Sequence, residues 1–388
     1  MKSSSLLVFI NRKLISIDTI IPLLCELKFY SKEIKIIVIC PDYSTLDAIN
    51  KNFFIRDQIN TIGSLKVLSL RNIYGKRTFL SILKCIIFIS SLAKNILLYK
   101  SNFIHFGILF KKPFKYLCYF NKKNVFFAES DSYGFTQLMQ DVTFMKINSP
   151  RIYPNIGSNS LIAFSKEWYL SKNINNKIYY FGTPRKRIYW QNIVKSNADK
   201  YLRKELKKNG FNPKSKIISI MLGYFGDLKY LSNKNSVYNC LEESIQMLSE
   251  CIKDEVIVLK PHVITDLDLL NNLLAGFKNT KFLISNLHPM LLATRSKFAI
   301  ANYYSTTLSD FNSLGVKTIE YTDYNNKALL LTNGGSLRPD KVEFFINKDQ
   351  IELKIAINKL LKTSYNKNIN YNTENIDNLF GALNGKKL

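Results

Sequence analysis

Short apolar runs alternate with longer amphipathic segments along most of the chain, and this pattern predicts strands and helices in turn. The first series of predicted strands covers residues 6–10, 34–40, 65–68, 103–106, 125–128, 161–164 and 177–181. Predicted helices over residues 16–29, 44–59, 78–99 and 113–120 lie between them. Alternation of this kind is typical of a parallel sheet that carries helices on both faces.

A long charged segment separates this series from a second one. We predict a helix over residues 189–209, which ends where Gly210 and then Pro213 break it. Beyond it, predicted strands cover residues 217–222, 256–259, 281–284, 298–301 and 316–321, and helices cover residues 239–253, 266–277, 289–295 and 308–314. The fold class is therefore α/β, with two doubly wound, Rossmann-like domains facing a cleft. The predicted boundaries are residues 1–190 and 216–362 for the domains, 191–215 for a linker and 363–388 for a polar tail.

The composition agrees with two folded domains and narrows the class of partner. At 388 residues, 46% of them hydrophobic, the chain is too long for one ordinary core and has ample apolar surface. Lys and Arg exceed Asp and Glu by 26, which favours an anionic partner such as a phosphorylated substrate or a membrane face. The basic residues are scattered, and the sequence contains no zinc finger, RNP motif or long basic arm. We therefore expect no nucleic-acid partner.

Three sequence features indicate where the protein is located in the cell and whether it binds a metal. They are the cysteines, the histidines and the longest apolar segment. The six cysteines are far apart and form no CxxC pair, and the first ten residues lack a signal-peptide pattern, so a cytoplasmic protein is expected. Three histidines without ligand spacing predict no metal site. Lys84 and Lys94 interrupt the apolar segment 79–99. That segment is predicted to pack on the sheet or to lie on an anionic membrane leaflet, and not to span a bilayer.

Polar residues follow two predicted strands of the second series. Lys260 and His262 come directly after one strand, and the hydroxyl residues Ser305, Thr306 and Thr307 come shortly after another. Because ligands bind outside the carboxyl ends of parallel strands, we expect both groups at one crevice. Hydroxyls and amides at a helix start suit a phosphate group. The alternatives are that the histidine caps its strand and that a hydroxyl caps the following helix.

Four other residues are candidates for ligand contacts. Gly223 and Gly226 flank an aromatic pair after a core strand, where the backbone can approach a phosphate or ribose, although tight turns explain glycines equally well. Glu320 ends a strand and is a candidate acceptor for ribose hydroxyls, or an ordinary strand-end glutamate. Arg185 follows a predicted strand end and suits a sugar carboxylate or a phosphate; a structural ion pair is the alternative.

The first domain contributes an acidic segment. An apolar strand leads into Glu129 and Asp131, and Tyr133 and Gly134 follow. Either carboxylate is a candidate general base at the edge of the cleft, and Tyr133 is a candidate substrate contact. Both carboxylates are also typical of turns and helix N-caps.

Some of these residues resemble motifs of a known enzyme class. Lys260-Pro261-His262 is similar to the Lys-x-His-Pro signature of bacterial enzymes that use CMP-activated sugars, namely sialyltransferases, polysialyltransferases and Kdo transferases with the GT-B architecture. Ser305-Thr306-Thr307 stands where those families place a Ser/Thr pair on the donor phosphate, and the acidic segment is similar to the loop that supplies their base. His288, followed by Pro289, opens a predicted helix, a position that in these families touches the nucleotide. Val263 departs from the signature, since proline is expected there.

The resemblance implies a glycosyltransferase that moves an acidic sugar, Kdo or a sialic acid, from a CMP-activated donor. The implied acceptor is a glycan or glycolipid of lipopolysaccharide or capsule type, reached at the inner leaflet of the membrane. In this scheme Glu129 or Asp131 activates the acceptor, His262 stabilises the leaving phosphate, and no cofactor beyond the donor is needed. A CDP-polyol phosphotransferase of teichoic-acid type is the nearest alternative. A non-catalytic polysaccharide-assembly or nucleic-acid-binding protein is another.

Overall fold

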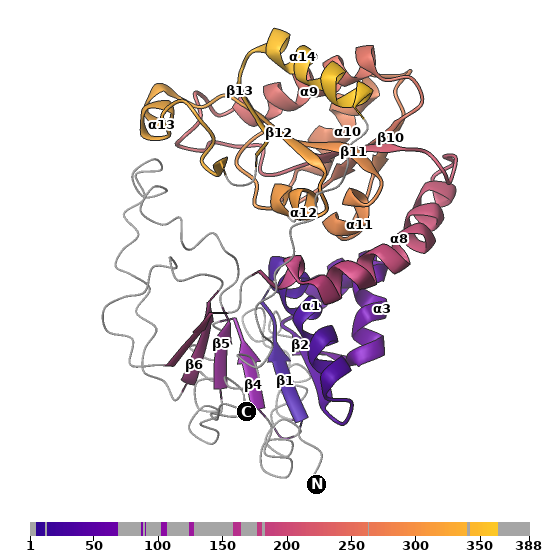
Figure 1. The fold of residues 1–388 in the computed structure, drawn as a ribbon, viewed down its shortest axis with the longest axis vertical. Helices are drawn as coiled ribbons and strands as arrows, with labels where there is room; N and C mark the ends of the chain where they lie inside the picture. The colour runs from indigo at the N-terminus through magenta and orange to yellow at the C-terminus, as the bar shows by residue number, and fades with distance from the viewer. Residues whose placement is uncertain are drawn as a thin grey trace. The chain divides into compact units, whose positions relative to one another are not determined.

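The chain folds into two compact units that meet in sequence between Trp190 and Gln191 (Figure 1). The computed structural model describes residues 5–11, 14–68, 87, 90, 102–106, 124–127, 158–163, 177–180, 183–262, 264–339 and 342–363. The predicted helix over residues 113–120 lies outside these residues, as do nearly all of the predicted helix over residues 78–99 and of the predicted tail. Among the described residues, no helix combines the length and the apolar character that crossing a bilayer requires.

The first unit is built on a parallel sheet. Its strands are β1 (Ser5–Phe9), β2 (Lys35–Cys40), β3 (Gly63–Val67), β4 (Asn102–His105), β5 (Asn124–Phe127), β6 (Ser158–Ala163) and β7 (Lys177–Tyr180). They lie in the order β3-β2-β1-β4-β5-β6-β7, and every neighbouring pair is parallel. The order reverses direction between β1 and β4, which defines a doubly wound sheet. This confirms the fold predicted for the first half.

The described helices of this unit differ from the prediction in one place. Helix α1 (Leu14–Tyr30) matches the predicted element, but the single helix predicted over residues 44–59 is two helices, α2 (Tyr43–Lys51) and α3 (Phe53–Ile62). Asn52 separates them with φ −94° and ψ 75°, and its side chain accepts a hydrogen bond from the Ile55 amide at 3.4 Å. An asparagine side chain that bonds to a nearby backbone amide competes with the helical pattern, so the helix stops and restarts there.

A buried ion pair links α1 to the end of this unit. Arg187 follows the short 3₁₀ helix η4 (Pro184–Lys186). Its guanidinium donates from both Nε and Nη2 to the two carboxylate oxygens of Glu26, and the Nη2 to Oε1 distance is 2.8 Å. The side chains are 7% and 6% exposed. The bidentate geometry satisfies both charges inside the protein.

The second unit contains a second parallel sheet. Its strands are β8 (Ile217–Met221), β9 (Val256–Lys260), β10 (Phe282–Ile284), β11 (Ser296–Ala301), β12 (Lys317–Thr322) and β13 (Phe344–Asn347). The order β10-β9-β8-β11-β12-β13 is again entirely parallel, and it reverses between β8 and β11. A ligand crevice is expected outside the carboxyl ends of the strands at such a reversal.

The described helices that lie wholly or mostly in this unit are α8 (Ile188–Lys208), α9 (Ser236–Cys251), α10 (Leu267–Ala275), α11 (Pro289–Ala293), α12 (Leu308–Ser313), α13 (Asn326–Leu331) and α14 (Gln350–Lys362). Residues 191–208 of the predicted linker are part of α8, and three elements, β13, α13 and α14, are absent from the prediction. One face of the sheet, including Ile220, Leu259, Ile300 and Tyr321, forms a continuous apolar core with buried residues of α9 and α14.

Candidate functional site

Three loops meet at the carboxyl edge of the second sheet, where the strand order reverses. Strand β8 lies between β9 and β11, so the loops that follow these strands are neighbours. The loop after β8 contains Gly223, the loop after β9 contains His262, and the loop after β11 contains residues 302–307; Lys260 is the last residue of β9. The structure thus brings the predicted histidine and hydroxyl residues to one edge of one domain.

Side-chain contacts hold these loops together. The Thr265 hydroxyl donates a hydrogen bond to the Gly223 carbonyl at 2.9 Å and accepts one from the His262 amide, also at 2.9 Å. On the other side of Gly223, the ring of Tyr303 lies so close that a Cβ atom at residue 223 would be 2.2 Å from it. A side chain at residue 223 would therefore force the ring of Tyr303 to move from its place against the first loop.

His262 presents its side chain to solvent. The Ile264 amide donates to the imidazole Nδ1 at 3.4 Å, a long hydrogen bond. An accepting Nδ1 places the proton of the neutral ring on Nε2. The exposed histidine is thus oriented by its own loop and offers an N–H donor, the group that a phosphate oxygen needs. Lys260 is half-buried at the end of β9.

The hydroxyl residues precede α12. The carbonyls of Ser305, Thr306 and Thr307 accept from the amides of the first helical turn at 3.4, 3.2 and 3.0 Å. Thr307 is the N-cap residue, and its side chain makes no capping hydrogen bond. Ser305 is 8% exposed, while the two threonines are half-buried. The structure therefore assigns none of these hydroxyls the capping role that was the alternative interpretation of this segment.

Two predicted ligand contacts are inside the fold. His288 has no exposed surface, and its Nδ1 accepts from the Met290 amide at 3.2 Å, so it is the N-cap of α11. Glu320 is also fully buried, and its carboxylate accepts hydrogen bonds from the Tyr324 and Ser336 hydroxyls, the latter at 2.7 Å. These placements differ from the accessible nucleotide contacts predicted from the sequence, because His288 caps its own helix and Glu320 binds two hydroxyls from the residues that follow β12.

Burial strongly changes the acidity of Glu320. Loss of hydration raises the pKa of Glu320 from 4.5 to about 7, although the hydrogen bonds from Tyr324 and Ser336 act in the opposite direction. The folded protein therefore binds a proton at this residue more tightly than the unfolded chain does.

We expect this residue to make the protein less stable as the pH rises. Between pH 4.5 and about 7 the folded state carries the proton and the unfolded state does not, so the free energy of unfolding falls as pH rises across that window. The loss from this residue is about 3 kcal/mol, and it is complete above the folded pKa. In the variant Glu320→Gln the free energy of unfolding should lack this pH-dependent loss. Urea denaturation of both proteins at pH 5 and pH 8 measures it, and identical pH dependence in the two would contradict the assignment.

The remaining predicted residues belong to the first half of the chain. Arg185 lies in η4 and is buried within the first unit, at 5% exposure. Glu129, Asp131 and Tyr133 lie outside the described residues, so the predicted base and acceptor contact stay predictions. In the part of the chain that the structure describes, no group of His, Cys, Asp and Glu residues is arranged to hold a metal.

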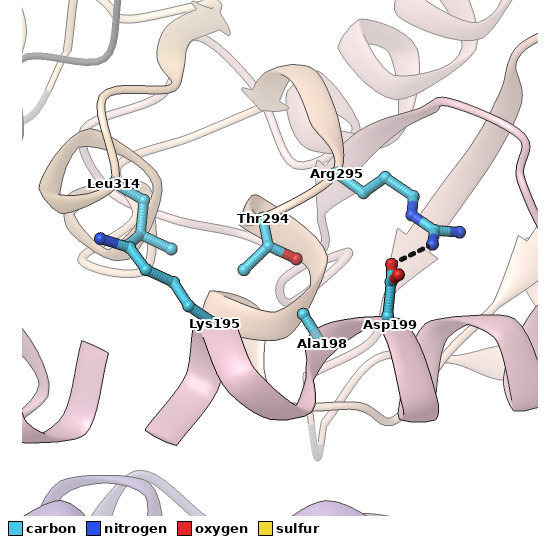
Figure 2. Close-up of a pocket in the computed structure, with 6 residues that line it drawn as sticks. All are labelled: Lys195, Ala198, Asp199, Thr294, Arg295 and Leu314. Atoms are coloured by element: carbon cyan, nitrogen blue, oxygen red, sulfur yellow. Dashed lines mark hydrogen bonds and ion pairs between the residues drawn. The ribbon is translucent and has the colours of Figure 1, made fainter. Parts of the chain in front are cut away.

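A separate pocket of about 290 Å³ lies beside α8 and is lined by Lys195, Ala198, Asp199, Thr294, Arg295 and Leu314. Figure 2 shows the Arg295 side chain reaching Asp199, to which it donates at 2.6 Å. Arg295 directly precedes β11 and Leu314 shortly precedes β12, so the pocket lies toward the amino ends of these strands. The pocket differs from the candidate nucleotide site in its position and in its arginine, because Arg295 is paired with Asp199 of the same pocket.

Sequence reasoning did not identify two residues that organise the site. Thr265 joins two loops through its hydroxyl, and Tyr303 packs on Gly223. In the sequence, Thr265 is only a threonine three residues after His262, and Tyr303 is only an aromatic residue after a strand. Neither local pattern indicates contact with Gly223, which lies 42 residues before Thr265 and still further before Tyr303. Only the pairing of β8 with β9 and β11 brings these partners together.

Comparison with known proteins identifies the fold. No protein-family model and no curated protein sequence matches the chain. Among solved structures, UDP-GlcNAc 2-epimerase from Methanocaldococcus jannaschii is similar, with a TM-score of 0.57 and 15% identity over 98% of this chain and 100% of that one. The same enzyme from Neisseria meningitidis, bound to UDP-GlcNAc, has a TM-score of 0.56 and 14% identity, covering 92% and 91%. A protein named TcCGT1, solved with UDP, has a TM-score of 0.53 and 10% identity, covering 93% and 91%.

These likenesses confirm the predicted architecture. The chain has the fold of two parallel-sheet, Rossmann-like domains that nucleotide-sugar enzymes of the GT-B class share. At such low identity the comparisons show the fold alone. The uridine nucleotides in the neighbouring structures give no support for the predicted preference for CMP.

Proposed function

We propose that the protein is a glycosyltransferase that uses a nucleotide-activated sugar and binds the donor phosphate at the carboxyl edge of the second sheet. The observation that carries this proposal is the joining of three loops there by Thr265 and by the Tyr303–Gly223 contact. At the reversal point of this Rossmann-like sheet lie an exposed histidine and three successive hydroxyl residues, of which the N-cap Thr307 makes no capping hydrogen bond with its side chain. The GT-B fold of the chain supports the same conclusion.

Each residue has a role in the proposed reaction. The bond between the anomeric carbon and the phosphate oxygen breaks, and its electron pair stays on the leaving nucleotide. His262 donates its Nε2 hydrogen to that phosphate, while Lys260 and the hydroxyls of Ser305, Thr306 and Thr307 add positive charge and hydrogen bonds. The acceptor hydroxyl attacks the anomeric carbon and loses its proton to Glu129 or Asp131.

For the donor we propose a CMP-activated acidic sugar, Kdo or a sialic acid, and for the acceptor a lipopolysaccharide or capsule glycan. The support is the similarity of Lys260-Pro261-His262 to the signature of CMP-sugar enzymes, and the net charge of +26, which suits an anionic donor. A UDP-sugar is the competing donor.

A second candidate function is epimerisation of a UDP-sugar. The similarity of the fold to two UDP-GlcNAc 2-epimerases favours it. The two reactions differ in their products, because transfer releases a nucleotide and forms a glycosidic bond whereas the epimerase product keeps its nucleotide.

Nucleotide binding gives the first test. We expect CMP to raise the unfolding temperature of the full chain more than CDP, UDP or GDP at equal concentration, since a ligand at 100 times its Kd stabilises the folded state by about 2.7 kcal/mol. Preferential stabilisation by UDP would replace the proposed donor while retaining the site. If no nucleotide stabilises the wild type, the proposed phosphate site is wrong. Chromatography of the reaction with a CMP-sugar and with UDP-GlcNAc then separates transfer from epimerisation.

A further inference from the structure

A group of large apolar side chains is exposed on the first unit, where the end of α1 meets the start of α8. Phe29, Tyr30 and Ile188 are 56%, 60% and 47% exposed. The ring of Phe29 contacts both Tyr30 and Tyr189, with centroid distances of 5.2 Å in each case. We call Phe29, Tyr30, Ile188 and Tyr189 the aromatic patch.

Lysines border the aromatic patch. Lys28 lies on α1, Lys32 lies in the turn that follows it, and Lys35 is the first residue of β2. Glu33 is the one exposed carboxylate between Lys28 and Lys35. Lys28 donates to the carbonyls of Lys32 and Ile34 at 2.6 and 2.8 Å, so its charge stays beside the patch without a carboxylate partner. Lys32 and Lys35 form no ion pair with any residue that the structure describes.

The charges beneath the patch cancel each other. Glu26 and Arg187, the nearest buried ionic groups on α1 and before α8, form the bidentate pair described above. The exposed charge around the aromatic patch is therefore predominantly positive, and the same ion pair fixes α1 against the segment that carries Tyr189.

We propose that the aromatic patch docks on the surface of an anionic lipid bilayer. Exposed aromatic rings on a soluble domain mark an interaction surface, and Phe and Tyr are suited to the boundary between headgroups and acyl chains because their rings are apolar and the Tyr hydroxyl stays hydrated. The lysines supply attraction to acidic headgroups, so the surface combines the two signals that stable peripheral binding requires. The chain's net charge of +26 acts in the same direction.

This surface is independent of the proposed transfer reaction, since docking needs neither donor nor acceptor. Its failure and the failure of the proposed function are therefore distinguishable. Vesicle binding tests the patch, whereas nucleotide binding and product analysis test the site on the second unit.

The experiment is co-sedimentation of the full chain with vesicles of phosphatidylcholine, with and without phosphatidylglycerol. We expect binding only to the vesicles that contain phosphatidylglycerol, and weaker binding at high salt. The variant F29S/Y30S should bind about tenfold more weakly, because it loses roughly 1.4 kcal/mol of apolar insertion. The charge variant K32E/K35E should also lose most of its binding.

Matched controls make the result specific. The variant I351S/I355S removes two apolar side chains that are 75% and 62% exposed on α14, and K253E/K278E makes the same charge change at exposed lysines of the second unit. The apolar control should bind like the wild type, and the charge control should bind more strongly than K32E/K35E. Circular dichroism verifies that each variant is folded. Equal vesicle binding by the wild type and folded F29S/Y30S would overturn the proposal. So would a wild type that binds no vesicle and that light scattering shows to be a dimer joined through the aromatic patch.

Discussion

Replacing His262 with alanine is expected to slow sugar transfer about 100-fold or more while leaving the free energy of unfolding nearly unchanged. The loss follows from the role of the imidazole, which donates a hydrogen bond to the phosphate as negative charge develops on it, an effect typically worth a factor of 10² to 10⁴. The stability should persist because the side chain is exposed and its hydrogen bond with the Ile264 amide is long. Nucleotide release, measured by chromatography under saturating donor, reports the rate.

Two further variants separate donation from positioning. His262→Gln keeps an N–H donor near the same place and should recover part of the lost rate. Thr265→Val removes the hydroxyl that joins the loops of Gly223 and His262, so it should raise KM for the donor while changing kcat less. If His262→Ala turns over donor as fast as the wild type, the histidine has no part in the reaction.

The variant Arg187→Met is expected to lower the free energy of unfolding of the first unit by about 3–5 kcal/mol, because it leaves the Glu26 carboxylate buried without its partner. Both side chains of the wild-type pair are at most 7% exposed, so water cannot replace the lost hydrogen bonds. Urea denaturation followed by circular dichroism measures the change. A loss of this size is a large part of the stability of an ordinary domain.

The matched control is the double variant E26M/R187M. Replacing a buried pair by apolar side chains of similar volume is often neutral, so the double variant should be clearly more stable than Arg187→Met. If the two variants are equally unstable, the loss comes from packing around residue 187 and not from the unpaired carboxylate.

Most of the fold was predictable because parallel strands have a simple signature. Strands that are covered on both faces consist of uninterrupted apolar residues, as in Val256–Lys260, where four residues in succession are buried. Such runs separated by helical segments define both sheets, and the observed strand order is that of doubly wound folds. Boundaries were less accurate where a single side chain decides them. Asn52 ends one helix and caps the next, and the helical period on either side gives no sign of the break.

The end of the second unit escaped prediction for a related reason. Strand β13 (Phe344–Asn347) is short, and only Ile346 among its residues is fully buried, so its local pattern is weak. Helix α14 exposes Ile351 and Ile355, which blurs its amphipathic period. Pairing with β12 and packing of α14 on α9 stabilise these elements, and both are contacts between segments far apart in sequence.

By itself, the sequence determined the class of fold and the ends of strands at which a ligand site is expected, because hydrophobic periodicity and the polar residues that follow apolar runs are local properties. The tertiary structure decided which of those residues stay accessible. It left His262 in solvent, buried His288 and Glu320, joined the loops through Thr265 and paired Glu26 with Arg187 across 161 positions. These outcomes depend on which distant segments become neighbours, and a local pattern of residues carries no such information.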